Sequence, residues 1–309
     1  MSRVPVLEIG GTHVTAAVID TTSAGPAPLD AVRQPVPADA PADDLLDAIA
    51  AVGARVDVPE GAHWGVAIPG PFDYETGIGR FRGIGKFESL HGVDVGAGLL
   101  ARLPGAPRRI SFVNDADAFA MGEYRAGAAA GRSRAVCITL GTGVGSSFLD
   151  GGQPVVEGPE VPPGGRAHRL TAHGLPLEEV VSRRAIRSFH ATAAALPGDG
   201  PHPDVHDIAA AARGGNAPAL HTIRHCFGAL GRALAPWCER FEPELMVVGG
   251  SMAGSWDLVG PAIREGFESW APGSAPAMVP ALRPADAPLI GAAHSTLQGC
   301  RGPSGTDLE

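Results

Sequence analysis

The sequence predicts an α/β protein of two related lobes that face a cleft, and three observations support this fold class. The chain has 309 residues, and at roughly 150 residues per domain this length favours two domains. Apolar residues alternate between strand-like and helix-like spacing along the chain, which is typical of α/β domains. A strand, a glycine-rich turn and a second strand lead each half, so we expect the two lobes to share one design.

The charge and the apolar pattern exclude several classes of function. There are 24 Lys and Arg against 33 Asp and Glu, which gives a net charge of -9, and Lys86 is the single lysine. Neither nucleic-acid phosphates nor anionic lipids attract such a charge, so we expect no nucleic-acid partner and no membrane partner. No apolar run approaches the length of about 18 residues that spans a bilayer. The N-terminus also lacks an apolar signal segment, so we expect a cytoplasmic protein.

The first lobe is expected over residues 1–114. It opens with a hairpin, because the turn Gly10-Gly11-Thr12 separates two apolar runs. A helix is expected over 43–57, where Pro41 and an acidic first turn precede apolar residues at helical spacing. The other expected elements are, in order, strands at 4–9, 13–20 and 29–37, a buried strand that ends at Ile68, a glycine-rich segment at 80–92, a helix near 94–102 and a strand at 109–113.

The second lobe is expected over residues 115–290, with residues 291–300 packing back on the first lobe. Residues 301–309 have too little apolar surface to dock, so we expect a disordered tail there. The expected elements of this lobe are, in order, a helix at 115–130, a hairpin at 134–149, helices at 177–196 and 217–240, a strand that runs into Gly249-Gly250, a helix from 256 to 268, a Pro-rich connection at 271–288 and a last helix near 291–299.

Three glycine-rich turns follow predicted strands, and they favour a phosphate ligand. Glycine lacks a Cβ, so the backbone can approach an anion, and exposed N–H groups in such a turn form a binding nest. One turn alone is equally typical of an ordinary hairpin, but three at strand ends favour a nucleoside triphosphate. No Walker-type loop occurs. The turns are Gly10-Gly11-Thr12, Gly141-Thr142-Gly143 and Gly249-Gly250.

Asn114 and Asp115 lie between a predicted strand and a predicted helix. One interpretation is a helix cap, because both residue types accept hydrogen bonds from free N–H groups at a helix start. The other is catalytic, since an ionised carboxylate can accept the proton of an alcohol during phosphoryl transfer. Asp117 is an alternative base, although it lies two residues further along the helix.

Six short motifs occur in one order along the chain and together resemble a known family. They are Glu8-Ile9-Gly10-Gly11-Thr12, the following Asp20, Pro69-Gly70-Pro71, Asn114-Asp115-Ala116-Asp117-Ala118, Leu140-Gly141-Thr142-Gly143-Val144-Gly145 and Val248-Gly249-Gly250. On these motifs, residues 6–297 resemble the ROK family of bacterial sugar kinases and sugar-responsive repressors. The resemblance implies an actin-like ATPase (ribonuclease H-like) fold whose two α/β lobes close on ATP and Mg²⁺.

The resemblance also implies a reaction and roles for residues. It implies transfer of the γ-phosphoryl group of ATP to a hexose, usually at the 6-hydroxyl, with Asp115 as the general base. Glu8 replaces the usual Asp and keeps a carboxylate for water-mediated contact with Mg²⁺. At the nucleotide we place Glu8, Gly10, Gly11, Thr12, Gly141, Thr142, Gly143, Gly249 and Gly250. At the sugar we place Asn114, His168, Glu178, Gly70, Gly165 and Arg166.

The zinc segment of the family is missing from this chain. Relatives commonly carry Glu-x-Gly-His and then a cysteine-rich segment; here His168 and Glu178 match, Gly165 replaces the first Glu, and the zinc cysteines are gone. With three of four ligands lost we expect no zinc, and we expect loop 171–176 to hold its shape by packing. Two histidine pairs at ligand spacing are interpreted as structural or solvated: His202 with His206, and His221 with His225.

The segment that relatives use to bind the sugar also departs from the family pattern. Relatives often have Asn before Trp, where this chain has Gly83-Ile84-Gly85-Lys86-Phe87. A lost polar contact leaves ring hydroxyls unpaired, so we expect a modified sugar or different contacts. Carboxylates nearby would favour an aminohexose such as glucosamine or kanosamine. The candidates for replacement contacts are Lys86, Glu157, Glu160 and Arg166.

We therefore expect an ATP-dependent hexose or aminohexose 6-kinase that forms a homodimer. One alternative is a polyphosphate-dependent glucokinase, because such relatives also lack the zinc cysteines, although the acidic net charge disfavours a long polyanion. Another alternative is a catalytically inactive protein that binds or senses sugar. A repressor is not expected, because its helix-turn-helix segment would precede the first hairpin, which begins here by residue 6.

Overall fold

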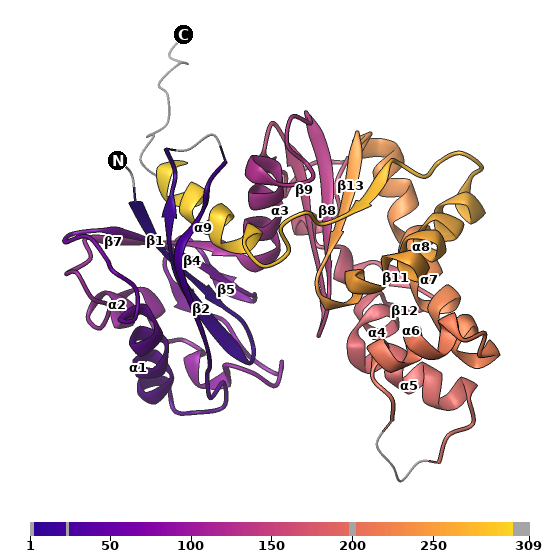
Figure 1. Ribbon diagram of the computed structural model, residues 1–309, viewed down its shortest axis with the longest axis horizontal. Helices are drawn as coiled ribbons and strands as arrows, with labels where there is room; N and C mark the ends of the chain where they lie inside the picture. Colours follow the sequence, from indigo (N-terminus) through magenta and orange to yellow (C-terminus); the bar gives the residue numbers. More distant parts are fainter. Residues whose placement is uncertain (1–2, 23–24, 198–201, 299–309) are drawn as a thin grey trace. The chain divides into compact units, whose positions relative to one another are not determined.

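The computed structural model describes residues 3–22, 25–197 and 202–298. The chain forms two compact units, which can be followed by colour in Figure 1. The first unit runs to Ala126 and takes in the C-terminal segment from Ala285, and the second unit is Gly127–Pro284. The disordered tail expected at 301–309 lies outside the described residues.

A five-stranded sheet forms the centre of the first unit, in the order β3-β2-β1-β4-β7. β1 pairs antiparallel with β2 and parallel with β4, and β7 extends the parallel part. The central strand β1 buries four successive residues from Val4 to Leu7, as expected for a strand covered on both faces. The strands are β1 (Arg3–Ile9), β2 (His13–Asp20), β3 (Ala27–Pro35), β4 (His63–Ile68) and β7 (Arg109–Asn114).

Helices cover this sheet. Helix α1 buries Leu45, Leu46 and Ile49, a spacing that forms one apolar face at 3.6 residues per turn. Helix α9, yellow in Figure 1, contacts β1 and β4. The remaining elements of the unit are α1 (Ala42–Gly53), β5 (Phe72–Asp73), β6 (Ile78–Gly79), the 3-10 turn η1 (Glu88–Leu90), α2 (Val95–Leu100), α3 (Asp115–Ala126) and α9 (Ala287–Gln298).

Helix α3 belongs to the first unit, although the sequence analysis begins the second lobe at residue 115. Its Ala118 lies in one buried cluster with Leu289 of α9 and Val6 of β1. Burial of these apolar faces together holds α3 and α9 on the same sheet. The units therefore divide at 126/127 and 284/285, whereas the sequence analysis divides them at 114/115 and 290/291.

The second unit repeats the sheet of the first. Its five strands lie in the order β10-β9-β8-β13-β14. The first two pairings are antiparallel and the last two are parallel, as in the first unit. The repeated strand, turn and strand design that the sequence predicts is confirmed by this shared order. The strands are β8 (Arg134–Leu140), β9 (Val144–Asp150), β10 (Gln153–Pro154), β13 (Leu245–Gly249) and β14 (Met278–Pro280).

One helical prediction for this unit needs correction, and one helix was not predicted. The helix expected over 177–196 is divided, because Ser182 has an extended backbone and its hydroxyl accepts a hydrogen bond from the Ala185 amide at 3.4 Å. A further helix, α6, follows Pro203, where Asp204 and Asp207 form a capping box. His202 lies before that helix, so it shares no helix face with His206.

The long helix α7 forms the centre of the apolar core in the second unit and packs against α8. Within the described ranges, no helix is both long and apolar enough to cross a membrane. The helices and short strands of the unit are η2 (Pro163–Gly165), η3 (Ala167–Arg169), β11 (Thr171–Ala172), β12 (Leu175–Pro176), α4 (Glu178–Val181), α5 (Arg183–Ala193), α6 (Val205–Arg213), α7 (Ala217–Phe241), η4 (Ser251–Ser255) and α8 (Trp256–Trp270).

The attachment of α9 to the first unit can be tested by substitution. Leu289 is 2% exposed in the cluster with β1, so Leu289→Ala leaves a cavity and is expected to lower the free energy of unfolding by about 2–4 kcal/mol. The control Leu29→Ala changes a side chain that is 54% exposed, and its effect should stay within about 0.5 kcal/mol. Urea unfolding measures both, and equal effects would contradict the packing.

Candidate functional site

Three parallel strands of the first unit end at one edge of its sheet. The β1–β4 pairing extends to Glu8, and Ile68 of β4 pairs with Asn114 of β7. Three segments therefore follow the ends of neighbouring strands: the turn at 10–12, the loop at 69–71 and the start of α3. Ligands of open α/β sheets bind at this carboxyl edge, and several residues predicted for the nucleotide and the sugar meet here.

Asn114 links two of these strand ends through a residue that the sequence analysis does not identify. Its side-chain amide donates to the Tyr74 hydroxyl at 2.9 Å, and that hydroxyl donates to the Ile68 carbonyl at 3.2 Å. The Asn114 side-chain oxygen also accepts from the amides of Ala116 (3.2 Å) and Asp117 (3.4 Å). The capping interpretation of Asn114 is therefore confirmed, and the cap sets the start of the helix on which Asp115 lies.

Two carboxyl groups, Glu8 and Asp115, interact at this edge. Burial raises the pKa of Glu8; the charge of Arg33 and a hydrogen bond with Thr15 oppose that rise, and the charge of Asp115 adds to it. Asp115 is half-buried, whereas the alternative base Asp117 is 7% exposed. A desolvated carboxylate beside a second one is stabilised by a cation, and oxygen ligands are those that Mg²⁺ prefers. The donor set therefore fits Mg²⁺.

In the second unit, the turn from Gly141 to Gly143 lies against the start of α4. The Gly141 amide donates to the Gly143 carbonyl at 3.0 Å, and the Arg183 amide donates to the Gly141 carbonyl at 3.1 Å. A Cβ at Gly143 would collide with the Glu178 carboxylate in its present position, so a larger residue there would displace that side chain. The structure thus brings Glu178, predicted for the sugar, beside the turn predicted for phosphates.

The third glycine turn lies next to the second. β13 pairs with β8 as far as Gly249, which lies opposite Thr139. Gly250 follows at the sheet edge and is exposed, as are Thr12 and Thr142 in the other two turns. Each of the three turns therefore follows the end of a strand and contains a solvent-exposed residue. The first turn belongs to the first unit, and the other two belong to the second unit.

An arginine-rich pocket of about 840 Å³ begins at Thr142. Among the described residues that line it, none is a carboxylate, and the charged or titratable ones are Arg183, Arg184, Arg187 and His202. Carboxylates outside the lining engage two of the arginines, since Arg183 pairs with Asp204 and Arg184 pairs with Glu179. The pocket joins a phosphate-type turn to a cationic surface, so it suits an anionic ligand.

Ser146, a residue with no recognisable motif in the sequence, holds the predicted sugar segment in place. Its hydroxyl, buried in β9, donates to the Gly165 carbonyl at 2.6 Å and accepts from the Ala167 amide at 2.8 Å. Gly165 is buried, and Arg166 and His168 are half-buried. Burial lowers the pKa of His168, and the two neighbouring arginines lower it further. His168 is therefore neutral at pH 7 and able to donate or accept one hydrogen bond on each ring nitrogen.

A stack of rings holds loop 171–176, for which packing in place of zinc is expected from the sequence. The loop forms the hairpin β11–β12, and its His173 ring stacks on His225 of α7 at 4.5 Å. The His225 ring also stacks on the Phe189 ring of α5. The centroids of these two rings are 4.1 Å apart, and the rings are nearly parallel. Among the described residues, no group of three or more His, Cys, Asp or Glu is placed to hold a metal ion. Ring stacking is the packing expected for this loop, and this stacking gives His225 a structural role.

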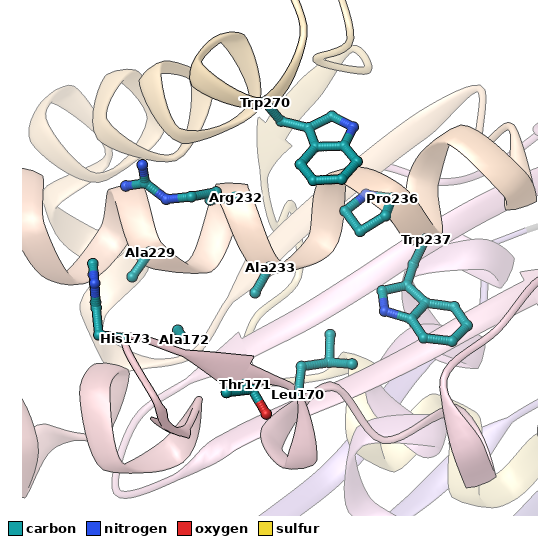
Figure 2. Close-up of a pocket in the computed structure, with 10 residues that line it drawn as sticks. All are labelled: Leu170, Thr171, Ala172, His173, Ala229, Arg232, Ala233, Pro236, Trp237 and Trp270. Carbon is teal, nitrogen blue, oxygen red and sulfur yellow. The ribbon is translucent and has the colours of Figure 1, made fainter.

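A separate pocket of about 360 Å³ lies between this hairpin and helices α7 and α8. Figure 2 shows the indoles of Trp237 and Trp270 at one end and Arg232 with His173 at the other. None of the residues predicted for the nucleotide or the sugar lines it. The predicted site therefore does not include this pocket.

The comparisons with known proteins agree with the predicted family. A family model described as the ROK family matches residues 5–298. A glucokinase from Thermotoga maritima is 31% identical over 247 residues, which cover 72% of this chain and 74% of that protein. A ROK family glucokinase from Streptomyces griseus, solved in complex with glucose and AMPPNP, has a TM-score of 0.76 at 27% identity, with 96% of this chain and 100% of that chain covered.

A third relative bears on the phosphoryl donor. The inorganic polyphosphate/ATP-glucomannokinase from Arthrobacter sp. strain KM has a TM-score of 0.68 at 26% identity, with 96% of this chain and 100% of that chain covered. The structural neighbours and the repeated sheets together identify the two-lobed actin-like ATPase fold. The predicted fold class is confirmed.

The ring stack can be tested through stability. His225→Ala removes both stacking contacts and is expected to lower the free energy of unfolding by about 1 kcal/mol, whereas His225→Phe should retain most of it. The control His206→Ala changes a side chain that is 85% exposed and should have little effect. Chemical unfolding measures the three variants, and a loss in His225→Phe as large as in His225→Ala would contradict the stacking role.

Proposed function

This chain belongs to the ROK family and is a sugar kinase, and on that premise we propose that it transfers the γ-phosphoryl group of ATP to the 6-hydroxyl of a hexose or aminohexose. The observation that carries the proposal is the shared carboxyl edge of β1, β4 and β7. That edge presents a glycine turn suited to phosphate and, at the start of α3, the Asp115 carboxylate.

Asp115 acts as the general base in this proposal. Its carboxylate accepts the proton of the 6-hydroxyl as that oxygen bonds to the γ-phosphorus, and ADP leaves. Asn114 caps the helix and, through Tyr74, is bound to the end of β4, so Asp115 has a defined place. Glu8 would hold Mg²⁺ through water; when bound, the ion neutralises charge on the phosphates.

Beside Asn114 and Gly70 of the first unit, the sugar contacts in this proposal include polar groups of the second unit. Neutral His168, whose segment is held by Ser146, and the Glu178 carboxylate both form hydrogen bonds with hydroxyl groups. A carboxylate also accepts hydrogen bonds from an ammonium group, which supports the inclusion of aminohexoses such as glucosamine and kanosamine. Glu160, one candidate for a replacement contact, accepts a hydrogen bond from Arg134 at 3.0 Å.

Polyphosphate is the second candidate donor, and the arginine pocket is the observation that favours it. The pocket extends from Thr142 along α5 and is lined by three arginines, two of which also pair with carboxylates outside the lining. Arginine binds phosphate oxygens in a bidentate manner. The Arthrobacter relative, which is named for both donors, supports keeping this alternative.

The base is tested with Asp115→Asn. A release assay for ADP with ATP and Mg²⁺, run on glucose, mannose, their N-acetyl forms, glucosamine and kanosamine, first finds the sugar that the wild type uses. On that sugar, Asp115→Asn is expected to lower kcat by about 10²–10⁴-fold, because a positioned base contributes that much. Calorimetric binding of AMPPNP should persist, which shows that the variant is folded.

Asp117→Asn serves as the matched comparison. It should keep most of the turnover, since Asp117 is buried within α3. Loss of turnover in Asp117→Asn with normal turnover in Asp115→Asn would assign the base to Asp117. Failure of the wild type to release ADP with every sugar, together with no sugar phosphate from polyphosphate, would instead favour the inactive sugar-binding alternative.

The donor is tested by substitution at the edge of the arginine pocket. The Arg184 side chain is 70% exposed, so Arg184→Gln is expected to leave the ATP-dependent rate within about twofold. If polyphosphate is a donor, the same variant should raise the KM for polyphosphate several-fold and weaken its dependence on salt. Sugar phosphate formation with each donor is measured, and no product with polyphosphate would exclude that alternative.

A further inference from the structure

The single lysine of the chain lies over the first glycine turn. Lys86 belongs to the glycine-rich segment at 80–92, and its side chain is half-buried. A Cβ built on Gly11 would lie 3.0 Å from Cδ and 3.6 Å from Nζ of Lys86. The lysine side chain therefore crosses the turn close to Gly11, with its ammonium group near the turn backbone.

The loop before Lys86 is held by one carboxylate. The amides of Gly83, Ile84 and Gly85 donate to Glu88 at 3.0, 2.7 and 3.0 Å. These three bonds lower the pKa of Glu88, so the carboxylate stays ionised and the loop keeps its shape at neutral pH. The backbone from which Lys86 extends is thus ordered by local hydrogen bonds.

The residue after Lys86 anchors the loop to the core. The Phe87 ring is fully buried and lies 5.4 Å from the Phe81 ring. Its amide donates to the Ala38 carbonyl at 3.1 Å, and the Ser89 hydroxyl donates to the Ala40 carbonyl at 2.7 Å. Lys86 is therefore held on both sides, which reduces the conformational freedom that it would lose on binding a ligand.

The electrostatics at this point call for an anion. Within the described part of the chain, Lys86 forms no ion pair, and the amides of Gly11 and Thr12 donate no hydrogen bond to another residue. The ammonium group and the amide N–H groups are all hydrogen-bond donors, so they do not bind one another. A phosphoryl oxygen between them would accept hydrogen bonds from both.

We propose that Lys86 is a catalytic residue that binds the transferring phosphoryl group at the turn Gly10-Gly11-Thr12, an inference that rests on the proposed kinase function. The lysine supplies a charge-assisted hydrogen bond to an oxygen of the group as negative charge shifts during transfer. It takes part in no covalent step and exchanges no proton. The interaction stabilises the transition state because the donor is placed before the reaction begins.

The test compares Lys86→Met, Lys86→Arg and a control on the same loop, Arg82→Met, whose side chain is exposed. Lys86→Met is expected to lower kcat by about 10²-fold and to leave the sugar KM within about twofold. Lys86→Arg should retain part of the rate because it keeps the charge, and Arg82→Met should behave like the wild type.

Nucleotide binding gives a readout that is independent of turnover. Only AMPPNP carries a γ-phosphate, so Lys86→Met is expected to raise the Kd of AMPPNP about tenfold and that of ADP less than about twofold. Unchanged kcat together with an unchanged ratio of the two Kd values would overturn the role of Lys86. A rise in the sugar KM alone would also overturn it, since the lysine would then contact the acceptor.

The outcomes also separate this inference from the proposed function. A wild type that binds AMPPNP through Lys86 but releases no ADP with any sugar would reject the kinase activity and retain phosphate binding by the lysine. A wild type that binds neither AMPPNP nor ADP would reject both.

Discussion

The site in the first unit depends on the register of three parallel strands. Because β1, β4 and β7 end together, a glycine turn, a proline-flanked loop and the start of α3 lie at one edge of the sheet. The hydrogen bonds from Asn114 to Tyr74 and from Tyr74 to Ile68 then tie two of those ends. A shift of one residue in β7 would turn Asn114 to the opposite face and remove that link.

The second unit has its own sheet with the same strand order, and this sheet supports a different set of contacts. Its glycine turn between β8 and β9 lies against Glu178, and Ser146 holds the segment that carries His168. The stacked rings of His173, His225 and Phe189 hold the hairpin at which the family resemblance implies zinc cysteines. Metal coordination and ring stacking both restrain a short loop, although stacking contributes much less free energy.

Charge is distributed to suit phosphates in spite of the acidic composition. The net charge of -9 describes the whole chain, but ligands respond to the local field. One lysine at the first glycine turn and three arginines near the second give positive charge where the backbone also offers N–H groups. Burial raises the pKa of Glu8, and the nearby charge of Asp115 adds to that rise, so negative charge also gathers at this edge of the sheet.

The sequence alone determined the repeated α/β design, the strand and turn positions and the family, because glycine turns and apolar spacing are local signals. The motifs also predicted site roles for Asn114, Asp115, His168 and Glu178. The tertiary structure decided the boundary at 126/127, the partners Tyr74 and Ser146, the ring stack and the approach of Lys86 to Gly11. Each of these depends on contacts between residues far apart in the chain, which no local pattern records.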